Sequence, residues 1–359
     1  MTLEELLSAP QYSLDHDTKQ EILLEELNAL TAHHARRGAD YRRLLDVFGH
    51  DVRAASLARV PYLPVSLFKS HDLLSIPSDE VFKTMTSSGT TGAEVSRIYL
   101  DAATAQLQAR ALASIMTSVL GPQRLPMIVV DSPGVVRDRK RFNARAAGVL
   151  GMLNFGARHL YALDDDMELD VAGLDAWLER HGDRPFLMFG FTFMVWQYLY
   201  KRVAGLDLDL SNGILVHSGG WKKLRDEAVD NEQFKDALKS ATGLRRVYNF
   251  YGMIEQVGSV FLEGDDGFLY PPNFGDVIVR DPDTWEEAPL GKAGVIQVVS
   301  ALPRSYPGHS LLTEDLGVVH GVDDSVTGRR GKRFSVIGRV PKVELRGCSD
   351  THAYSRGAA

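Results

Sequence analysis

A loop of seven small and hydroxylated residues is the segment of this sequence best suited to chemistry. Its glycines let backbone amides turn toward a ligand, and its serine and threonine hydroxyls add hydrogen-bond donors. Such a loop can wrap a polyphosphate. It is not a Walker A loop, because the Lys-Ser/Thr pair and the helix that follows it are missing. A polar hairpin without a ligand is the alternative. The loop consists of Thr86, Ser87, Ser88, Gly89, Thr90, Thr91 and Gly92.

This loop and a second segment, YNFYGMIE at residues 248–255, resemble two nucleotide-binding motifs of the adenylate-forming superfamily. That superfamily includes acyl-CoA synthetases, luciferases and the adenylation domains of peptide synthetases. The resemblance implies that the loop binds the phosphates of ATP, that Tyr251 and Gly252 lie near the adenine, and that Glu255 helps to hold Mg²⁺. A carboxylate suits the last role because Mg²⁺ takes oxygen ligands. Ile254 stands where the family has a threonine, which removes a hydroxyl expected near the α-phosphate.

Three shorter segments resemble further motifs of the same superfamily. The turn of Ser218, Gly219 and Gly220 is similar to its adenine-binding turn, although a helix start with small residues is the alternative. Asp315, in the segment TEDLG, matches the aspartate of a T-G-D motif that accepts hydrogen bonds from the ribose hydroxyls. An ordinary turn residue is the alternative there. The Gly-Arg pair that ends at Arg339 resembles the hinge of the superfamily.

Within the superfamily, residues 14–352 resemble the acyl-protein synthetases of the LuxE type, whose nearest relatives are phenylacetate-CoA ligases. The resemblance implies that ATP activates a fatty acid, that the acyl group moves to a cysteine near the C-terminus, and that it is then passed to a partner protein. The segments that carry it are PYLPVSLFKS (61–70), FGFT (189–192), SGGWK (218–222), YGMIEQ (251–256) and LRGCSDT (345–351).

Cys348 matches the position of that family's cysteine and is the only thiol in the chain. A thioester is chemically reasonable here, because a thiolate is a strong nucleophile and the acyl group stays activated. Arg346 and His352 would favour the thiolate. The alternative for a lone cysteine is a small buried hydrophobic residue. The expected acyl acceptor after Cys348 is a reductase or a carrier protein.

The lysine of the adenylation step has no obvious counterpart. Full-length members of the superfamily carry this lysine on a C-terminal lobe, but only 20 residues follow Arg339, so we expect that lobe to be truncated. Lys342, close to the hinge, is the predicted substitute that neutralises phosphate charge. Lys69 is a second candidate.

Alternating strands and helices are predicted to position these residues. Apolar spacing predicts two helices between residues 14 and 57, and strands alternate with helices over residues 126–250, which is typical of a mainly parallel sheet flanked by helices. From Gly258 onward, short β-rich runs predict a smaller β-rich subdomain. We therefore expect an α/β fold with an adenylation body at residues 1–257, the β-rich subdomain at 258–337, and a short mobile tail with Cys348 at 338–359.

The composition argues against several classes of protein. A formal net charge of −7 and a pI near 5.9 argue against a nucleic-acid-binding protein, which needs an excess of Lys and Arg. No stretch has the pattern of a signal peptide or the length of a membrane span. One cysteine cannot form an internal disulfide, which fits a reducing compartment. These features predict a cytoplasmic protein.

The motifs together predict a ligase that uses ATP and Mg²⁺ to convert a carboxylic acid, expected to be a fatty acid, to acyl-AMP and transfers the acyl group to Cys348. Direct transfer to coenzyme A or a carrier protein is the first alternative. A nucleotide-binding protein without catalysis is the second, because Ile254 and the short C-terminus depart from the superfamily pattern. The aromatic-rich segment 189–200 forms either the wall of an acyl tunnel or ordinary core.

Overall fold

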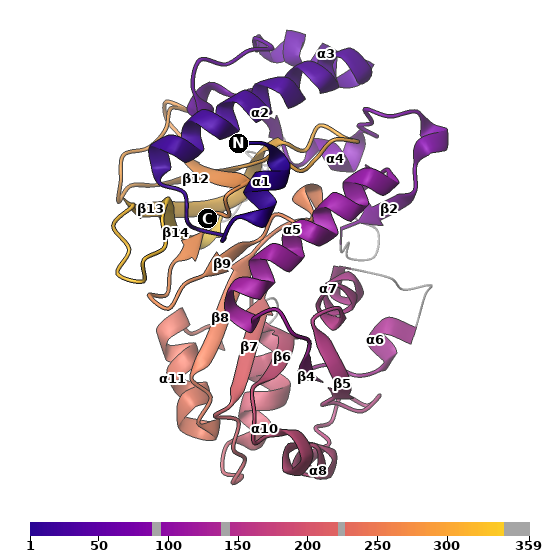
Figure 1. The fold of residues 1–359 in the computed structure, drawn as a ribbon, viewed down its shortest axis with the longest axis vertical. Coiled ribbons are helices and arrows are strands. Elements are labelled where there is room, and N and C mark those ends of the chain that lie inside the picture. The colour runs from indigo at the N-terminus through magenta and orange to yellow at the C-terminus, as the bar shows by residue number, and fades with distance from the viewer. Residues whose placement is uncertain (88–94, 138–143, 222–226, 341–359) are drawn as a thin grey trace, which may run out of the picture.

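The computed structural model describes residues 1–87, 95–137, 144–221 and 227–340. Within these ranges, a 12-stranded sheet forms the frame of the fold (Figure 1). In its parallel half the strand order is β5 (Gly156–Tyr161), β4 (Leu125–Val129), β6 (Phe186–Phe191), β7 (Gly213–Ser218) and β8 (Arg246–Tyr251). In its antiparallel half the order continues with β9 (Phe261–Glu263), β10 (Leu269–Tyr270), β14 (Lys332–Arg339), β13 (Ser310–Val322), β12 (Ala293–Ser300) and β11 (Gly275–Arg280).

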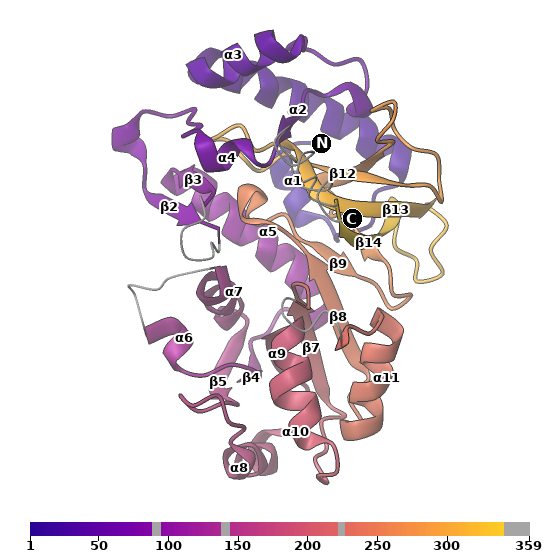
Figure 2. The same cartoon turned by 180° about the vertical axis from the view of Figure 1, so that it is seen from behind.

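Helices cover both faces of the parallel half. Alternate residues of a strand point to opposite faces, so Met127 and Val129 of β4 pack in a different core cluster from Ile128 and Val130. The first face packs against α5 (Ala102–Leu120) and α7 (Ala144–Leu153). The second face packs against α8 (Val171–His181), the π-helix η4 (Val195–Tyr200) and α11 (Asn231–Thr242), as seen from behind in Figure 2.

The antiparallel half packs against the N-terminal helices and joins the parallel half through β8. Tyr251 at the end of β8 pairs antiparallel with Phe261 of β9, whereas the other edge of β8 pairs parallel with β7. Beside this half lie α1 (Leu3–Ser8), α2 (His16–Arg37), α3 (Ala39–Phe48), α4 (Leu67–Ser70) and the strand β1 (Leu63–Pro64), which pairs with β13. Strands β2 (Lys83–Thr86) and β3 (Arg97–Leu100) form a separate hairpin.

Local sequence signals explain several element boundaries. The Asp101 carboxylate accepts a hydrogen bond from the Thr104 amide at 2.7 Å and begins α5, which ends at Gly121 in a positive-φ conformation. In α11, Asp230 and Gln233 form a reciprocal capping box, so the helix begins at Asn231. The sequence pattern predicts a helix from Trp221 to Thr242, and the predicted start is wrong, because Trp221 is not helical.

The α/β fold with a mainly parallel sheet and a β-rich region is confirmed. The β-rich region is antiparallel and continues the same sheet. The domain boundaries at residues 257 and 337 stay a prediction. Among the described residues, no helix is both long enough and apolar enough to span a bilayer.

Candidate active site

The predicted adenine-binding turn lies at the carboxyl ends of the parallel strands. Phe191, Ser218 and Phe250 end or nearly end three neighbouring strands and are aligned by the sheet register. Ligands of open α/β sheets bind at this edge. Gly219 comes next along the chain with a φ of +85°, a conformation that side-chain-bearing residues rarely adopt, and a Cβ added there would lie 3.3 Å from the Phe191 ring. The chain therefore exposes the backbone of a tight turn at the edge where a ligand is expected.

Three residues predicted from separate motifs meet beside this turn. The Tyr251 hydroxyl donates a hydrogen bond to Asp315 Oδ2 at 2.8 Å, and Arg339 Nε lies 3.4 Å from Asp315 Oδ1. Burial, and secondarily the charge of Asp315, raises the pKa of Tyr251 well above its usual value, so the phenol stays a donor. The Asp315 amide also donates to the Thr313 hydroxyl at 3.1 Å. Asp315 is thus held by both its side chain and its backbone.

Glu255 lies in a short 3-10 turn, η6 (Ile254–Gln256), shortly after β8 and is 7% exposed. Burial raises the pKa of its carboxyl, while the nearby Ser96 hydroxyl and the Lys69 ammonium lower it. The side-chain amide of the next residue, Gln256, donates to the carbonyl oxygens of Val298 and Gly308 and anchors the turn on the antiparallel half. A single buried carboxylate next to a hydroxyl fits Mg²⁺, which usually takes one or two carboxylates together with phosphates of the substrate.

The two ends of the predicted phosphate loop are joined next to Glu255. The Ser87 amide donates to the Ser96 carbonyl at 3.1 Å, and the Ser96 amide donates to Ser87 Oγ at 2.9 Å. Thr86 pairs with Arg97 in the hairpin below them. The rest of the loop, Ser88, Gly89, Thr90, Thr91 and Gly92, lies outside the described residues, as do Lys342 and Cys348.

A lysine–glutamate pair also lies at this site. Lys69 Nζ is 3.7 Å from Glu314 Oε1, and Glu314 directly precedes Asp315. The sequence suggested Lys69 only as a second candidate, and Glu314 was not predicted to belong to the site. One signal was present, because Glu314 occupies the middle position of the T-E-D segment, where the superfamily motif has a glycine.

Comparison with known proteins identifies the family. The family model for acyl-protein synthetases of the LuxE type matches residues 3–355. The chain belongs to the LuxE acyl-protein synthetase family. This LuxE-family chain is 24% identical over 359 residues to the long-chain-fatty-acid–luciferin-component ligase of Vibrio harveyi, covering 92% of this chain and 89% of that protein. The predictions of the family and of a ligase are confirmed.

Solved structures show that the LuxE-family chain has the fold of an acyl-CoA ligase. An open conformation of 2-hydroxyisobutyryl-CoA ligase in complex with 2-HIB-AMP and CoA superposes with a TM-score of 0.70 at 19% identity, covering 93% of this chain and 78% of that one. The postadenylation state of the same ligase with 2-HIB-AMP also gives 0.70 at 19% identity, covering 91% and 69%. At this identity the likeness establishes the fold alone.

The aromatic segment of the LuxE-family chain divides between core and site. Phe189 is fully buried in the sheet core, and Trp196 stacks on Phe234 with ring centroids 5.8 Å apart. Phe191 instead reaches Gly148 of α7 and Gly219 of the turn, because a Cβ added at either glycine would lie close to its ring. Phe191 therefore lies beside the predicted adenine-binding turn.

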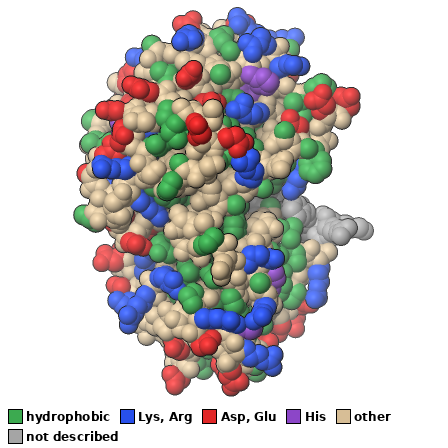
Figure 3. All heavy atoms as spheres, viewed as in Figure 1, with side chains coloured by type: hydrophobic (Ala, Val, Ile, Leu, Met, Phe, Trp, Pro, Cys, Tyr) green, Lys and Arg blue, Asp and Glu red, His purple; other side chains and the backbone are tan. Residues whose placement is uncertain are grey.

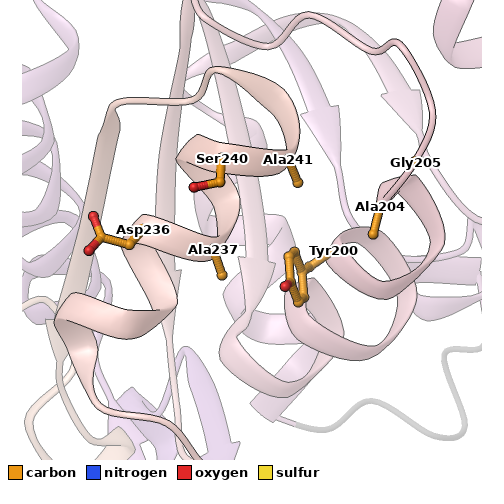
Figure 4. A pocket seen from close by; sticks show the side chains of 7 residues that line it. All are labelled: Tyr200, Ala204, Gly205, Asp236, Ala237, Ser240 and Ala241. Carbon is orange, nitrogen blue, oxygen red and sulfur yellow. The ribbon is translucent and has the colours of Figure 1, made fainter.

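Other surface features of the LuxE-family chain do not coincide with the site. Acidic and basic side chains are interspersed over the face in Figure 3 and do not gather in one basic patch. A hollow of about 420 Å³ lies between the helices of Tyr200 and Ser240 (Figure 4). None of the predicted site residues lines it.

Proposed function

We propose that this chain uses Mg-ATP to activate a long-chain fatty acid as an acyl-adenylate, transfers the acyl group to Cys348, and then passes it to a partner protein. The observation that carries the proposal is the hydrogen bond from Tyr251 to Asp315 at the carboxyl edge of the parallel strands, with Glu255 in the turn that follows β8. The family supports a ligase, and the name of the Vibrio harveyi relative supports a long-chain fatty acid.

In the first step, a carboxylate oxygen of the acid attacks the α-phosphorus of ATP. The bond from that phosphorus to the bridging oxygen breaks, and pyrophosphate leaves with the electron pair. Asp315 would accept the ribose hydroxyls, and the backbone at Gly219 and Gly220 would face the adenine. Glu255 would hold Mg²⁺, which neutralises phosphate charge when bound. The protein's contribution is positioning and charge neutralisation at a preformed site.

In the second step, the Cys348 thiolate attacks the acyl carbonyl carbon, the thioester forms, and AMP leaves with the anhydride oxygen; the thiol proton passes to solvent. The attachment of the tail supports this step, because the Val340 amide donates to the Glu314 carbonyl at 2.9 Å. Eight residues, 341–348, extend from Val340 to the cysteine, and an extended chain spans about 3.3–3.6 Å per residue. Cys348 is thus within roughly 26–29 Å of a point beside the site.

The test is the intact mass of the protein after incubation with Mg-ATP and fatty acids of increasing chain length. We expect an ATP-dependent acyl adduct that hydroxylamine removes, because hydroxylamine cleaves thioesters. Cys348→Ser should lose the adduct and keep acid-dependent ATP–pyrophosphate exchange. AMP release that depends on added coenzyme A or carrier protein, with no adduct, would instead indicate direct transfer. No acid-dependent exchange in the unmodified chain would rule out the adenylation chemistry.

A further inference from the structure

Lys69 is fixed at the candidate site by its surroundings and not only by its pair with Glu314. Its helix, α4, follows β1, whose residues pair with β13 immediately before Thr313. The Val65 amide donates to the Leu312 carbonyl at 2.8 Å and continues that attachment. The residue before Lys69, Phe68, is fully buried and packs edge-on against Tyr306 with ring centroids 6.2 Å apart. The backbone of Lys69 is therefore held against the strand that carries Glu314 and Asp315.

The Lys69 ammonium lies beside the strand of one residue with a predicted nucleotide role and acts electrostatically on another. It forms the 3.7 Å pair with Glu314, next to the predicted ribose acceptor Asp315, and it is close enough to Glu255 to act on that carboxyl. A nucleotide with its ribose at Asp315 and its phosphates at Glu255 would run past Lys69. The Lys69 side chain is 37% exposed and that of Glu314 is 43% exposed, so solvent and ligands reach both groups.

The balance of charges at the site distinguishes the role of Lys69 from that of Arg339. Glu255, Glu314 and Asp315 bring three carboxyl groups to the site, and a triphosphate adds further negative charge. Two cations of the described residues lie near these carboxyl groups. Arg339 pairs with Asp315, at the predicted ribose end of the site. Lys69 is the cation at the Glu255 end. Its partner Glu314 is a partly exposed carboxylate in a pair that is not tightly closed, so a phosphate can replace it.

We propose that Lys69 binds the phosphates of ATP during adenylation and that Glu314 holds its ammonium between turnovers. This inference rests on the proposed function and assigns the cation of its first step. While the α-phosphorus gains the acyl oxygen and loses pyrophosphate, the Lys69 side chain neutralises the charge that gathers on the leaving group. The transfer from acyl-AMP to Cys348 releases no pyrophosphate. Lys69 is therefore required for the first half-reaction and dispensable for the second.

The experiment measures the two half-reactions separately in Lys69→Met, Lys69→Arg and the control Lys239→Met, which removes an exposed lysine from α11. Lys69→Met should lower acid-dependent ATP–pyrophosphate exchange by roughly 100-fold or more, the usual effect of losing one charge-stabilising group. Lys69→Arg keeps the charge and should retain part of the exchange. Acyl transfer to Cys348 from chemically prepared acyl-AMP should stay within about twofold of the unsubstituted chain in all three variants.

Glu314→Gln sharpens the test, because it removes the competitor and keeps the shape of the side chain. We expect a lower KM for ATP and retained exchange in this variant. The inference is overturned if Lys69→Met exchanges pyrophosphate within threefold of the unsubstituted chain, or if both half-reactions fall equally in the folded variant. If the unsubstituted chain itself shows no acid-dependent exchange, the proposed function fails as well, so the two failures are distinguishable.

Discussion

The parallel and antiparallel halves of the sheet contribute different things to the candidate site. In the parallel half, β6 and β7 are buried almost along their whole length, and the site receives only the turns at their carboxyl ends, above all the exposed turn at Gly219 and Gly220. In the antiparallel half, β13 has both buried and partly exposed positions, and Glu314 and Asp315 are partly exposed residues near its middle. The parallel half thus contributes backbone groups of a turn to the site, whereas the antiparallel half contributes charged side chains.

This division suits a nucleotide whose two ends differ in chemistry. An adenine is neutral and can be bound by a tight backbone turn, whereas a metal ion takes carboxylate ligands and a polyphosphate is bound more strongly when cations lie nearby. Glu255 lies shortly after β8, the strand at which the two halves join, and is anchored to the antiparallel half through Gln256. Substitutions on the two sides of β8 should therefore have different effects.

The largest effect is expected at the junction. Glu255→Gln should lower acid-dependent ATP–pyrophosphate exchange by roughly 100- to 1,000-fold, because it removes a preorganised charge from the reacting centre. The same variant should melt at an equal or higher temperature. Burial raises the pKa of this carboxyl in the folded chain, so its ionised form costs stability at any pH above that pKa. A lower melting temperature together with retained exchange would contradict both expectations.

A smaller effect is expected on the antiparallel side. Asp315→Asn should raise the KM for ATP roughly 10- to 100-fold, because hydrogen bonds to a charged acceptor contribute about 1.5–3 kcal/mol. Tyr251→Phe removes one hydrogen-bond donor to the Asp315 carboxylate and should raise the KM for ATP about fivefold. Steady-state exchange at varied ATP separates the two. An equal loss in both variants would mean that Asp315 acts only through its bond with Tyr251.

The two halves should respond alike to acid, because each contains a buried neutral histidine. Burial lowers the pKa of His217, in β7, and of His309, directly before β13, to about 3. Between the ordinary value of 6.5 and about 3, the unfolded chain binds protons that the folded chain does not, so stability is complete above pH 6.5 and is lost as the pH falls through this window.

This pH dependence of stability can be tested with substitutions that remove the titrating imidazole but keep the hydrogen bond of one of its ring nitrogens. His217→Asn preserves an acceptor or donor for the Thr192 hydroxyl, and His309→Gln does so for Thr31. Each variant should reduce the slope of the free energy of unfolding against pH by at most about 1.4 kcal/mol per pH unit, which is the limit for one proton. Urea unfolding between pH 4 and 7 measures the slope. An unchanged slope in either variant would show that its histidine is already protonated in the folded chain.

The smallest effect is expected on the parallel side. Gly219→Ala places a side chain at a φ of +85° and 3.3 Å from the Phe191 ring, at a cost of about 1 kcal/mol, and should raise the KM for ATP roughly fivefold. Gly49→Ala, just after α3, is the matched control, because Gly49 also has a positive φ of +67°, nothing lies within 4 Å of its added Cβ, and it is not among the predicted site residues. Equal KM values for the two variants would remove the turn from the nucleotide site.

Sequence patterns predicted the parallel half well because its signals are local. The apolar runs at Phe186–Phe191 and Gly213–Ser218 and the cap at Asp101 each act within a few residues. The continuity of the sheet was not predictable, because it depends on pairing such as Tyr251 with Phe261, and local apolar patterns do not show which strands pair. The helix start at Asn231 was missed because the prediction rested on apolar residues and did not use the capping signal of Asp230 and Gln233.

Site residues were predictable where a motif names them and not where chain folding brings them together. Tyr251, Asp315 and Arg339 came from three motifs, and the structure joins them through direct contacts. Lys69 and Glu314 are far apart in the sequence and meet only because β1 attaches α4 to β13. Ser96 was likewise visible only in the structure, since its place beside Glu255 depends on the β2–β3 hairpin. The roles of Lys342 and Cys348 stay predictions.

The most direct test of the account is an experimental structure of the chain with a non-hydrolysable acyl-sulfamoyl adenosine, which has the shape of an acyl-adenylate. The account predicts that the ribose hydroxyls lie within hydrogen-bond distance of Asp315, that the adenine contacts the turn at Gly219, and that the sulfamoyl group lies on the Lys69 and Glu255 side of the ribose. An analogue bound elsewhere, such as in the hollow between Tyr200 and Ser240, would contradict the placement of the active site at the junction of the two halves.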